Sequence, residues 1–349
     1  MSAPARYNTS VPNADALVRL HLSESPFGAS PAAVHAASTE LTRVHRYPAP
    51  ERETLAEALA AHWNVAEDQV VVANGSDELV LATALTLGAR TRPGLVTAGT
   101  FPGYASALER IGRGAVAVPL EGSAVDVGAL AERLGEHGIC YVCHPHNPSG
   151  TALGRHDFAR LVAHARASDT PLVVDEAYHE FAAPDLPKVR DFLDSDAPVL
   201  ALRTFSKAYG LAALRIGYAI GRADLIGEVR RTLRVLPFSV NRVGQAAALA
   251  ALADQEFLGT VRKANERRRA WFGAELDRRG YPYLGSVTNF LAIRVPDSAL
   301  LQRVLAREHG ILVRDTGIFG FPGHLRVSLG AEHELDAFFE ALEASLWLT

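Results

Sequence analysis

Cysteine is almost absent from this chain of 349 residues. Its two cysteines, Cys140 and Cys143, lie within one apolar run, which excludes the disulfide framework of small secreted domains and suits a reducing compartment. Long apolar runs are also missing, because the nearest candidate, Leu79 to Leu87, is far shorter than the ~18 residues that span a membrane. Residues 1–10 contain no apolar signal segment. We therefore expect a cytoplasmic protein without a membrane span.

Excess charge of either sign is lacking as well. The formal net charge is −4, with 21% charged and 48% apolar residues. This composition is typical of an ordinary globular protein and gives no indication of a nucleic-acid partner. The length allows more than one hydrophobic core, so a small binding module is not expected.

Lysine is the scarcest of the common charged residues. Only Lys188, Lys207 and Lys263 occur among the 35 basic residues, so arginine serves wherever positive charge alone is sufficient. An amine can lose its proton and form an imine, whereas a guanidinium stays charged. Lys188 and Lys263 lie in polar, charged stretches that suit solvated side chains. Lys207 is therefore the candidate for amine chemistry.

The apolar pattern predicts an α/β fold with a large domain and a smaller one. Short apolar runs alternate with longer amphipathic segments, which indicates βαβ units and a mostly parallel central sheet. We predict strands in the large domain at residues 69–73, 94–97, 115–118, 139–143, 171–175 and 198–203. A smaller α+β domain follows, with a long helical region from Asn241, strands at 290–295 and 324–329, and a closing helix. We expect the arginine-rich run 262–269 to form a solvated helix face.

The expected organisation has three parts. Residues 1–40 form an N-terminal arm that belongs in part to the small domain, residues 41–245 form the large domain, and residues 246–349 form the small C-terminal domain.

A loop after an apolar strand carries Lys207. Ligands of parallel α/β sheets gather at such strand ends. Ser206 and Arg215 flank the lysine, and a hydroxyl and a guanidinium both donate hydrogen bonds to phosphate. The alternative is a solvated loop lysine, which the scarcity of lysine and the two nearby phosphate donors argue against.

A second anion site is predicted where a strand turns into a helix at Gly75, Ser76 and Asp77. Exposed amides and the helix dipole at such a turn attract a phosphate. The alternative is an ordinary helix start with Ser76 or Asp77 as the N-cap, and the two interpretations are compatible.

A third element is Asp175, at the end of an apolar strand, with Tyr178 three residues later. A buried carboxylate requires a cationic or hydrogen-bonding partner. A protonated pyridine nitrogen is such a partner. The hydroxyl of Tyr178 can donate a hydrogen bond to a phenolic oxygen on the same pyridine ring. Metal binding or helix capping by Asp175 is the alternative.

Two other patterns carry less weight. Cys140, Cys143, His144 and His146 suggest zinc, but a strand directs alternate side chains to opposite faces and no second ligand pair follows, so no metal site is expected. The glycines at 112 and 114 imitate a dinucleotide motif but precede a strand, whereas the motif must follow one.

Taken together, these elements resemble the fold-type I aminotransferases that depend on pyridoxal phosphate (PLP), in particular their histidinol-phosphate aminotransferase branch. The resemblance extends from about Arg19 to Gly330, and its order and spacing are more specific than any single motif. The matching stretches are residues 22–28, 46–48, 75–78, 146–150, 175–178, 203–211 and 310–315.

The resemblance implies a role for each residue. Lys207 would form the Schiff base with PLP, and Asp175 would pair with the pyridine nitrogen. The resemblance also implies two small-molecule partners, an amino donor and a 2-oxo acid acceptor, and it implies a homodimer. The remaining assignments are Asn147 and Tyr178 for the phenolic oxygen, Gly75, Ser76, Asp77, Ser206 and Arg215 for the phosphate, Phe101 for stacking on the ring, Tyr47 for the partner subunit's phosphate, and Arg314 and Arg326 for the anionic end of the substrate.

The chain departs from the family pattern near the substrate. Ser23, Ser25, His144 and His146 stand where asparagine is usual, and Phe101 replaces the commoner tyrosine. The donor could therefore be histidinol phosphate, an aromatic amino acid or a pathway-specific one. A decarboxylase of a phosphorylated amino acid on the same scaffold and a non-catalytic PLP-binding regulator are the alternatives.

Overall fold

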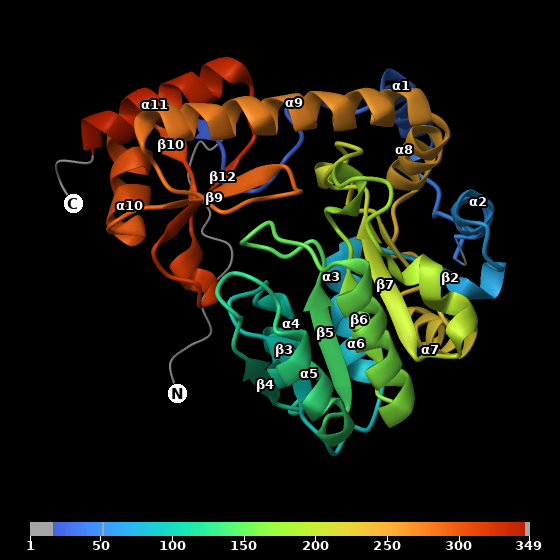
Figure 1. Cartoon of the computed structure of the whole chain (residues 1–349). Coiled ribbons are helices and arrows are strands. Elements are labelled where there is room, and N and C mark those ends of the chain that lie inside the picture. Colours follow the sequence, from blue (N-terminus) through green and yellow to red (C-terminus); the bar gives the residue numbers. More distant parts are fainter. Residues whose placement is uncertain (1–16, 51, 346–349) are drawn as a thin grey trace.

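A seven-stranded sheet is the largest element of the computed structural model, which describes residues 17–50 and 52–345 (Figure 1). Its strand order is β2-β8-β7-β6-β5-β3-β4. Neighbouring strands run parallel except at β8, which is antiparallel to both β2 and β7. The strands are β2 (Val70–Ala73), β3 (Gly94–Thr97), β4 (Ala115–Val118), β5 (Ile139–Cys143), β6 (Leu172–Asp175), β7 (Val199–Thr204) and β8 (Gly217–Gly221).

The sequence prediction for this sheet is confirmed with one omission. Every predicted strand is present to within one residue at each end. β8 was not predicted, because the short segment Gly217–Gly221 begins and ends with glycine, which is depleted in strands. The mostly parallel α/β architecture is therefore correct, with one antiparallel strand inserted near the edge.

Helices cover both faces of the sheet, because successive residues of one strand are buried in two different apolar cores. Along β2, Val70 and Val72 pack in one apolar core while Val71 and Ala73 pack in another. A strand buried on both faces is apolar at consecutive positions. The first face is covered by α2 (Glu53–Trp63), α5 (Val127–Arg133), α6 (Arg155–Ser168) and α8 (Arg242–Ala253), and the second by α3 (Gly75–Thr86), α4 (Gly103–Arg110) and α7 (Ala223–Leu233).

A smaller α+β unit lies beyond the carboxyl ends of the parallel strands (Figure 1). Its antiparallel sheet has the order β11-β12-β9, and a separate parallel pair joins β1 to β10. The third apolar core lies here and includes Leu20 beside Phe272 and Phe338, so the N-terminal segment packs with the C-terminal part. The elements are β1 (Val18–Arg19), α9 (Gln255–Arg279), β9 (Phe290–Arg294), α10 (Ser298–Glu308), β10 (Ile311–Leu312), β11 (Arg314–Asp315), β12 (His324–Ser328) and α11 (Glu332–Ser345).

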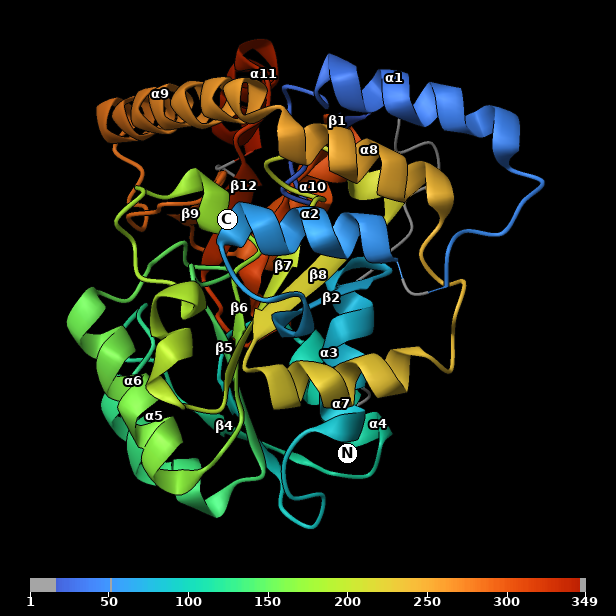
Figure 2. The same cartoon turned by 90° about the vertical axis from the view of Figure 1, so that its right-hand side faces the viewer.

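Helix α1 (Pro31–Glu40) lies against α8 on the outside of the molecule (Figure 2). The connections between elements contain short 3-10 turns, at Leu41–Arg43, Glu67–Gln69, Leu134–Glu136, His179–Phe181, Val189–Ser195, Ala212–Leu214 and Thr316–Phe319. Among the helices of the described residues, none combines the length and the hydropathy that crossing a bilayer requires.

The arginine-rich run of α9 is only partly the solvated face that the sequence predicted. Lys263 and Arg267 are exposed as expected. The guanidinium of Arg268, however, lies 4.8 Å from the centre of the Phe27 ring, and Arg269 donates a 3.0 Å hydrogen bond to the backbone oxygen of Thr288. The prediction is wrong for these two residues, because α9 turns one side of the run toward the N-terminal segment and the small sheet.

Candidate active site

A cavity of about 510 Å³ opens where the carboxyl ends of the parallel strands face the N-terminal segment. Ligand sites of open α/β sheets form at this edge. Nine of the residues predicted from the sequence line this cavity together, although they come from distant parts of the chain. They are Ser76, Asp77, Phe101, Asn147, Asp175, Tyr178, Ser206, Lys207 and Arg215.

Lys207 follows β7 and is half-buried at this cavity. Loss of solvent and, secondarily, the charge of Arg326 lower the pKa of its amine to about 8. The amine donates a 2.7 Å hydrogen bond to the backbone oxygen of Leu22 and lies 5.7 Å from the centre of the Tyr178 ring. A substantial fraction of this amine is therefore neutral near pH 8, as nucleophilic chemistry requires.

Asp175 ends β6 and is buried. Burial raises the pKa of its carboxyl to about 6, against the opposing effect of hydrogen bonds from Tyr104 and Ala177. The Tyr104 hydroxyl donates to one carboxylate oxygen at 2.5 Å, and the Ala177 amide donates to the other at 3.1 Å. Sequence reasoning did not select Tyr104, since its partner lies 71 residues later and no local motif marks it.

The start of α3 and Arg215 form the next part of the cavity. Arg215 donates a 2.8 Å hydrogen bond to Asp77, and its backbone adopts a left-handed conformation with φ of 56°. A Cβ atom at Gly75 would lie only 2.6 Å from the Arg215 guanidinium, so glycine is needed for the guanidinium to approach the helix start. Ser206 accepts a 2.9 Å hydrogen bond from Thr204. Amides, a hydroxyl and a guanidinium thus lie close to one helix N-terminus.

The predicted N-cap of α3 is wrong. Asn74 occupies the N-cap position, and neither Ser76 nor Asp77 does. The carboxylate of Glu78 instead accepts the Asn74 amide at 2.5 Å, while the Asp77 side chain pairs with Arg215. Both side chains proposed as caps therefore belong to the first turn, facing the cavity.

Asn147 connects this cavity to the small sheet. Its side-chain oxygen accepts a 2.5 Å hydrogen bond from Arg326, whose other terminal nitrogen donates to the backbone oxygen of His21 at 2.7 Å. Arg314 is the cross-strand partner of Arg326, so the two arginines predicted for the substrate lie on adjacent strands. Both are buried and neither lines the cavity directly. Burial, aided by Arg314, Arg19 and Arg326, lowers the pKa of His21 to about 4.

Tyr47 lies apart from these residues. Its side chain is 78% exposed and stacks on Phe238 with ring centres 4.7 Å apart. Within one subunit the structure therefore does not bring Tyr47 to the cavity.

The histidines of the loop after β5 have structural partners. His144 accepts the Leu153 amide at 3.1 Å, and its other ring nitrogen lies 3.0 Å from the backbone oxygen of Pro187. His146 pairs with the Ser149 hydroxyl at 2.8 Å. Within residues 17–50 and 52–345, no cluster of three or more metal-binding side chains occurs.

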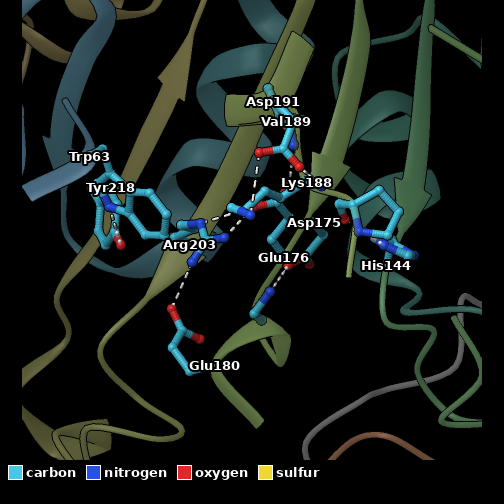
Figure 3. A network of polar contacts seen from close by, with 12 residues as sticks. Trp63, His144, Asp175, Glu176, Glu180, Lys188, Val189, Asp191, Arg203 and Tyr218 are labelled. Atoms are coloured by element: carbon cyan, nitrogen blue, oxygen red, sulfur yellow. Dashed lines mark hydrogen bonds and ion pairs between the residues drawn. The ribbon is translucent and has the colours of Figure 1, made fainter. Parts of the chain in front are cut away.

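A buried charge network joins the end of β6 to β7 (Figure 3). The Arg203 guanidinium lies 2.6 Å from Glu176 and 2.9 Å from Glu180, and 4.1 Å above the Trp63 ring. The second oxygen of Glu176 accepts the Val189 amide at 2.7 Å. Glu176 follows Asp175 directly, and Arg203 lies four residues before Lys207, so the network fixes the two strand ends that carry them.

The N-terminal segment closes one side of the cavity. The Ser23 amide donates to the Ser328 hydroxyl at 2.9 Å, and Asn289 donates to the backbone oxygen of Ser23 at 3.0 Å. The loop that carries Lys207 touches this segment backbone to backbone, because a Cβ atom at Gly210 would lie 2.0 Å from the oxygen of Gly28.

Known proteins share this sequence pattern and this fold. The model of the family "Aminotransferase class I and II" matches residues 16–344. The histidinol-phosphate aminotransferase of Symbiobacterium thermophilum is 38% identical over 337 residues, which cover 95% of this chain and 91% of that protein.

Solved structures agree with this relationship. The histidinol-phosphate aminotransferase of Sinorhizobium meliloti, solved in complex with pyridoxal-5'-phosphate, superimposes with a TM-score of 0.86 at 30% identity, covering 99% of both chains. The L-threonine-O-3-phosphate decarboxylase of Porphyromonas gingivalis superimposes with a TM-score of 0.81 at 25% identity, covering 95% of this chain and 100% of that one. The chain belongs to the aminotransferase class I and II family.

Proposed function

We propose that this chain transfers an amino group from a small amino donor to a 2-oxo acid such as 2-oxoglutarate, with Lys207 as the catalytic residue. The chain is a PLP-dependent aminotransferase similar to the histidinol-phosphate aminotransferases. The observation that carries the role of Lys207 is its amine of lowered pKa, in one cavity with the buried carboxyl of Asp175. Such a pair of shifted groups is typical of an active site.

The residues of the cavity fit PLP. The buried carboxylate of Asp175 accepts two hydrogen bonds, and a protonated ring nitrogen would supply the cationic partner that a buried carboxylate favours. Ser206, Arg215 and the amides at Gly75, Ser76 and Asp77 would bind the phosphate, and Phe101 would lie against the ring. Asn147 and Tyr178 would hold the phenolic oxygen. When bound, PLP supplies an electron sink that stabilises negative charge at the substrate's α-carbon.

The protein's own contribution is proton transfer and electrostatics. Lys207, once its amine is released, would act first as general base and then as general acid: it would take the proton from the substrate's α-carbon and deliver it to the C4′ carbon of the cofactor. In the second half of the reaction it would move the proton in the opposite direction. Its lowered pKa suits this role near neutral pH. Asp175 would keep the proton on the ring nitrogen, because a carboxylate beside it favours the protonated form.

Arg314 and Arg326 are the proposed holders of the substrate's anionic end. Their adjacent positions and the nearby Arg19 make this side of the site electropositive, and the charges of these three arginines contribute to the lowered pKa of His21. Histidinol phosphate, an aromatic amino acid or a pathway-specific amino acid all carry a suitable anionic group. Ser23, Ser25, His144 and His146 are the positions where the sequence departs from the usual asparagines.

We also propose a cytoplasmic homodimer in which Tyr47 reaches the phosphate of the partner subunit. Large apolar side chains are exposed on the 3-10 turn after α1 and on the connection after α7, and Tyr47 touches Phe238. Exposed apolar groups of this kind mark protein interfaces. They are Leu41, Val44, Tyr47, Val235, Leu236 and Phe238. The domain limits proposed are those of the sequence analysis, near residues 40 and 245.

Decarboxylation of a phosphorylated amino acid is the second candidate, because the decarboxylase of Porphyromonas gingivalis has the same fold over nearly the whole chain.

The experiment that separates the two candidates is to mix the PLP-loaded protein with single amino donors and to measure both the keto product and CO2. Amino transfer predicts a keto product and loss of the cofactor's aldehyde absorbance, which 2-oxoglutarate restores. Release of CO2 without a keto product would refute the proposal.

A further inference from the structure

Tyr104 is a fully buried tyrosine in the first turn of α4 whose ring is fixed on two sides. It stacks on Tyr141 with ring centres 5.2 Å apart and planes inclined by 8°. Phe101 meets it edge-on at 5.3 Å and 77°. Its hydroxyl donates to Asp175 at 2.5 Å. The direction of this donor is thus set by packing.

The two oxygens of Asp175 have one donor each, the Tyr104 hydroxyl and the Ala177 amide. Hydrogen bonds to the charged form of a carboxyl oppose the effect of burial. Burial also raises the pKa of Tyr104 well above its ordinary value, so the phenol keeps its proton and remains a donor over the working pH range.

We propose that Tyr104 is a positioning residue that keeps Asp175 ionised and aimed at the ring nitrogen of PLP. This inference rests on the role proposed above for Asp175. Without the hydroxyl, only one donor would stabilise the buried carboxylate, and the carboxyl would take up its proton at a higher pH. The other ionisable groups that face Asp175 are Cys143 on β5, Asp77 on α3 and Lys207 after β7. None of them donates a hydrogen bond to the Asp175 carboxylate.

The test is the pH dependence of ligand binding to the PLP-free protein. Two ligands are compared, PLP and its carbocyclic analogue in which CH replaces the ring nitrogen. Tyr104→Phe should weaken PLP binding at pH 7 by about tenfold or more, the value of a hydrogen bond to a charged group. The pH below which PLP affinity falls should rise above that of the wild type. Affinity for the analogue should change little.

Tyr141→Phe is the matched control, since it removes a buried hydroxyl from the adjacent stacked ring. That hydroxyl lies 2.9 Å from Thr83 and does not touch Asp175. The control should bind PLP as the wild type does. Equal losses of PLP and analogue affinity in Tyr104→Phe, or the same effect in Tyr141→Phe, would reduce Tyr104 to a packing role.

A second pair of variants separates this inference from the proposed function. Asp175→Asn should bind PLP and the analogue about equally well, and if it retains a preference for PLP, the role of Asp175 itself is wrong. If Asp175→Asn loses the preference and Tyr104→Phe retains it, only the role of Tyr104 is wrong. If Tyr104→Phe folds poorly, 3-fluorotyrosine can replace Tyr104, because it is a stronger donor of similar shape. This replacement must lower the pH at which PLP affinity falls. If that pH is unchanged, the inference is overturned.

Discussion

The amine of Lys207 donates a hydrogen bond to the backbone oxygen of Leu22, which lies 185 residues earlier in the chain. The contact ties the loop after β7 to the N-terminal segment, which also pairs with the small sheet through Ser23 and Ser328. The lysine is therefore held in position before any ligand binds, and its amine must leave Leu22 when it reacts.

Covalent capture of PLP by the cofactor-free protein should rise with pH around a midpoint of about 8, because only the neutral amine of Lys207 reacts and burial lowers its pKa to that value. Stopped-flow absorbance measures the rate. Borohydride reduction and peptide mapping should then find the adduct on Lys207 and not on Lys188 or Lys263, and Lys207→Arg should form none. A midpoint near the ordinary lysine value of 10.5 would contradict the prediction.

Asp175→Asn should raise the thermal stability of the cofactor-free protein at pH 8. In the folded state the pKa of Asp175 is about 6, above its ordinary 3.8, so this carboxyl favours folding below pH 3.8 and the contribution is lost as the pH rises through 6. The gain should reach at most about 3 kcal/mol at pH 8, from the size of the shift. Calorimetry should show the gap between variant and wild type closing below pH 6. A gap that widens there would disprove the assignment of the shift to Asp175.

Replacing Arg203 by Met should destabilise the protein by about 3–5 kcal/mol at pH 8, because it leaves the buried carboxylates of Glu176 and Glu180 without their cation. Glu176→Gln is the matched variant and should cost less, since Glu180 still neutralises Arg203. Urea unfolding measures both. The deficit of Arg203→Met should shrink in acid, where the carboxyls become protonated, and a larger effect of Glu176→Gln would reverse the expected order.

Tyr47→Ser should weaken the proposed dimer and PLP retention together, since it removes both the exposed ring that touches Phe238 and the hydroxyl proposed for the partner's phosphate. Tyr47→Phe keeps the ring and should leave the dimer intact while lowering PLP affinity. Light scattering after size exclusion and equilibrium dialysis measure the two effects. Normal PLP affinity in Tyr47→Phe would exclude the hydroxyl from the phosphate site.

The strands and most of the site could be predicted from the sequence because both depend on local patterns. Apolar runs buried on both faces located β2 to β7, and strand-end polar residues located Lys207 and Asp175. β8 has no such run, and its place between β2 and β7 follows from pairing with strands far away in sequence.

The supporting contacts could not be predicted, since each joins residues that no spacing relates. Tyr104 reaches Asp175 and Arg326 reaches Asn147 through tertiary packing. The N-cap of α3 was assigned wrongly because local propensity favoured Ser76 or Asp77, whereas Arg215 engages Asp77 from 138 residues away.

The contact between Gly210 and Gly28 restricts how this enzyme can acquire new substrates. Two backbones meet there with no room for a methyl group on Gly210, so the path of the N-terminal segment past the lysine loop cannot change by small steps. Directed evolution of donor preference should therefore accumulate changes in side chains that the segment presents, such as Glu24, while insertions in the segment and any replacement of Gly210 are eliminated.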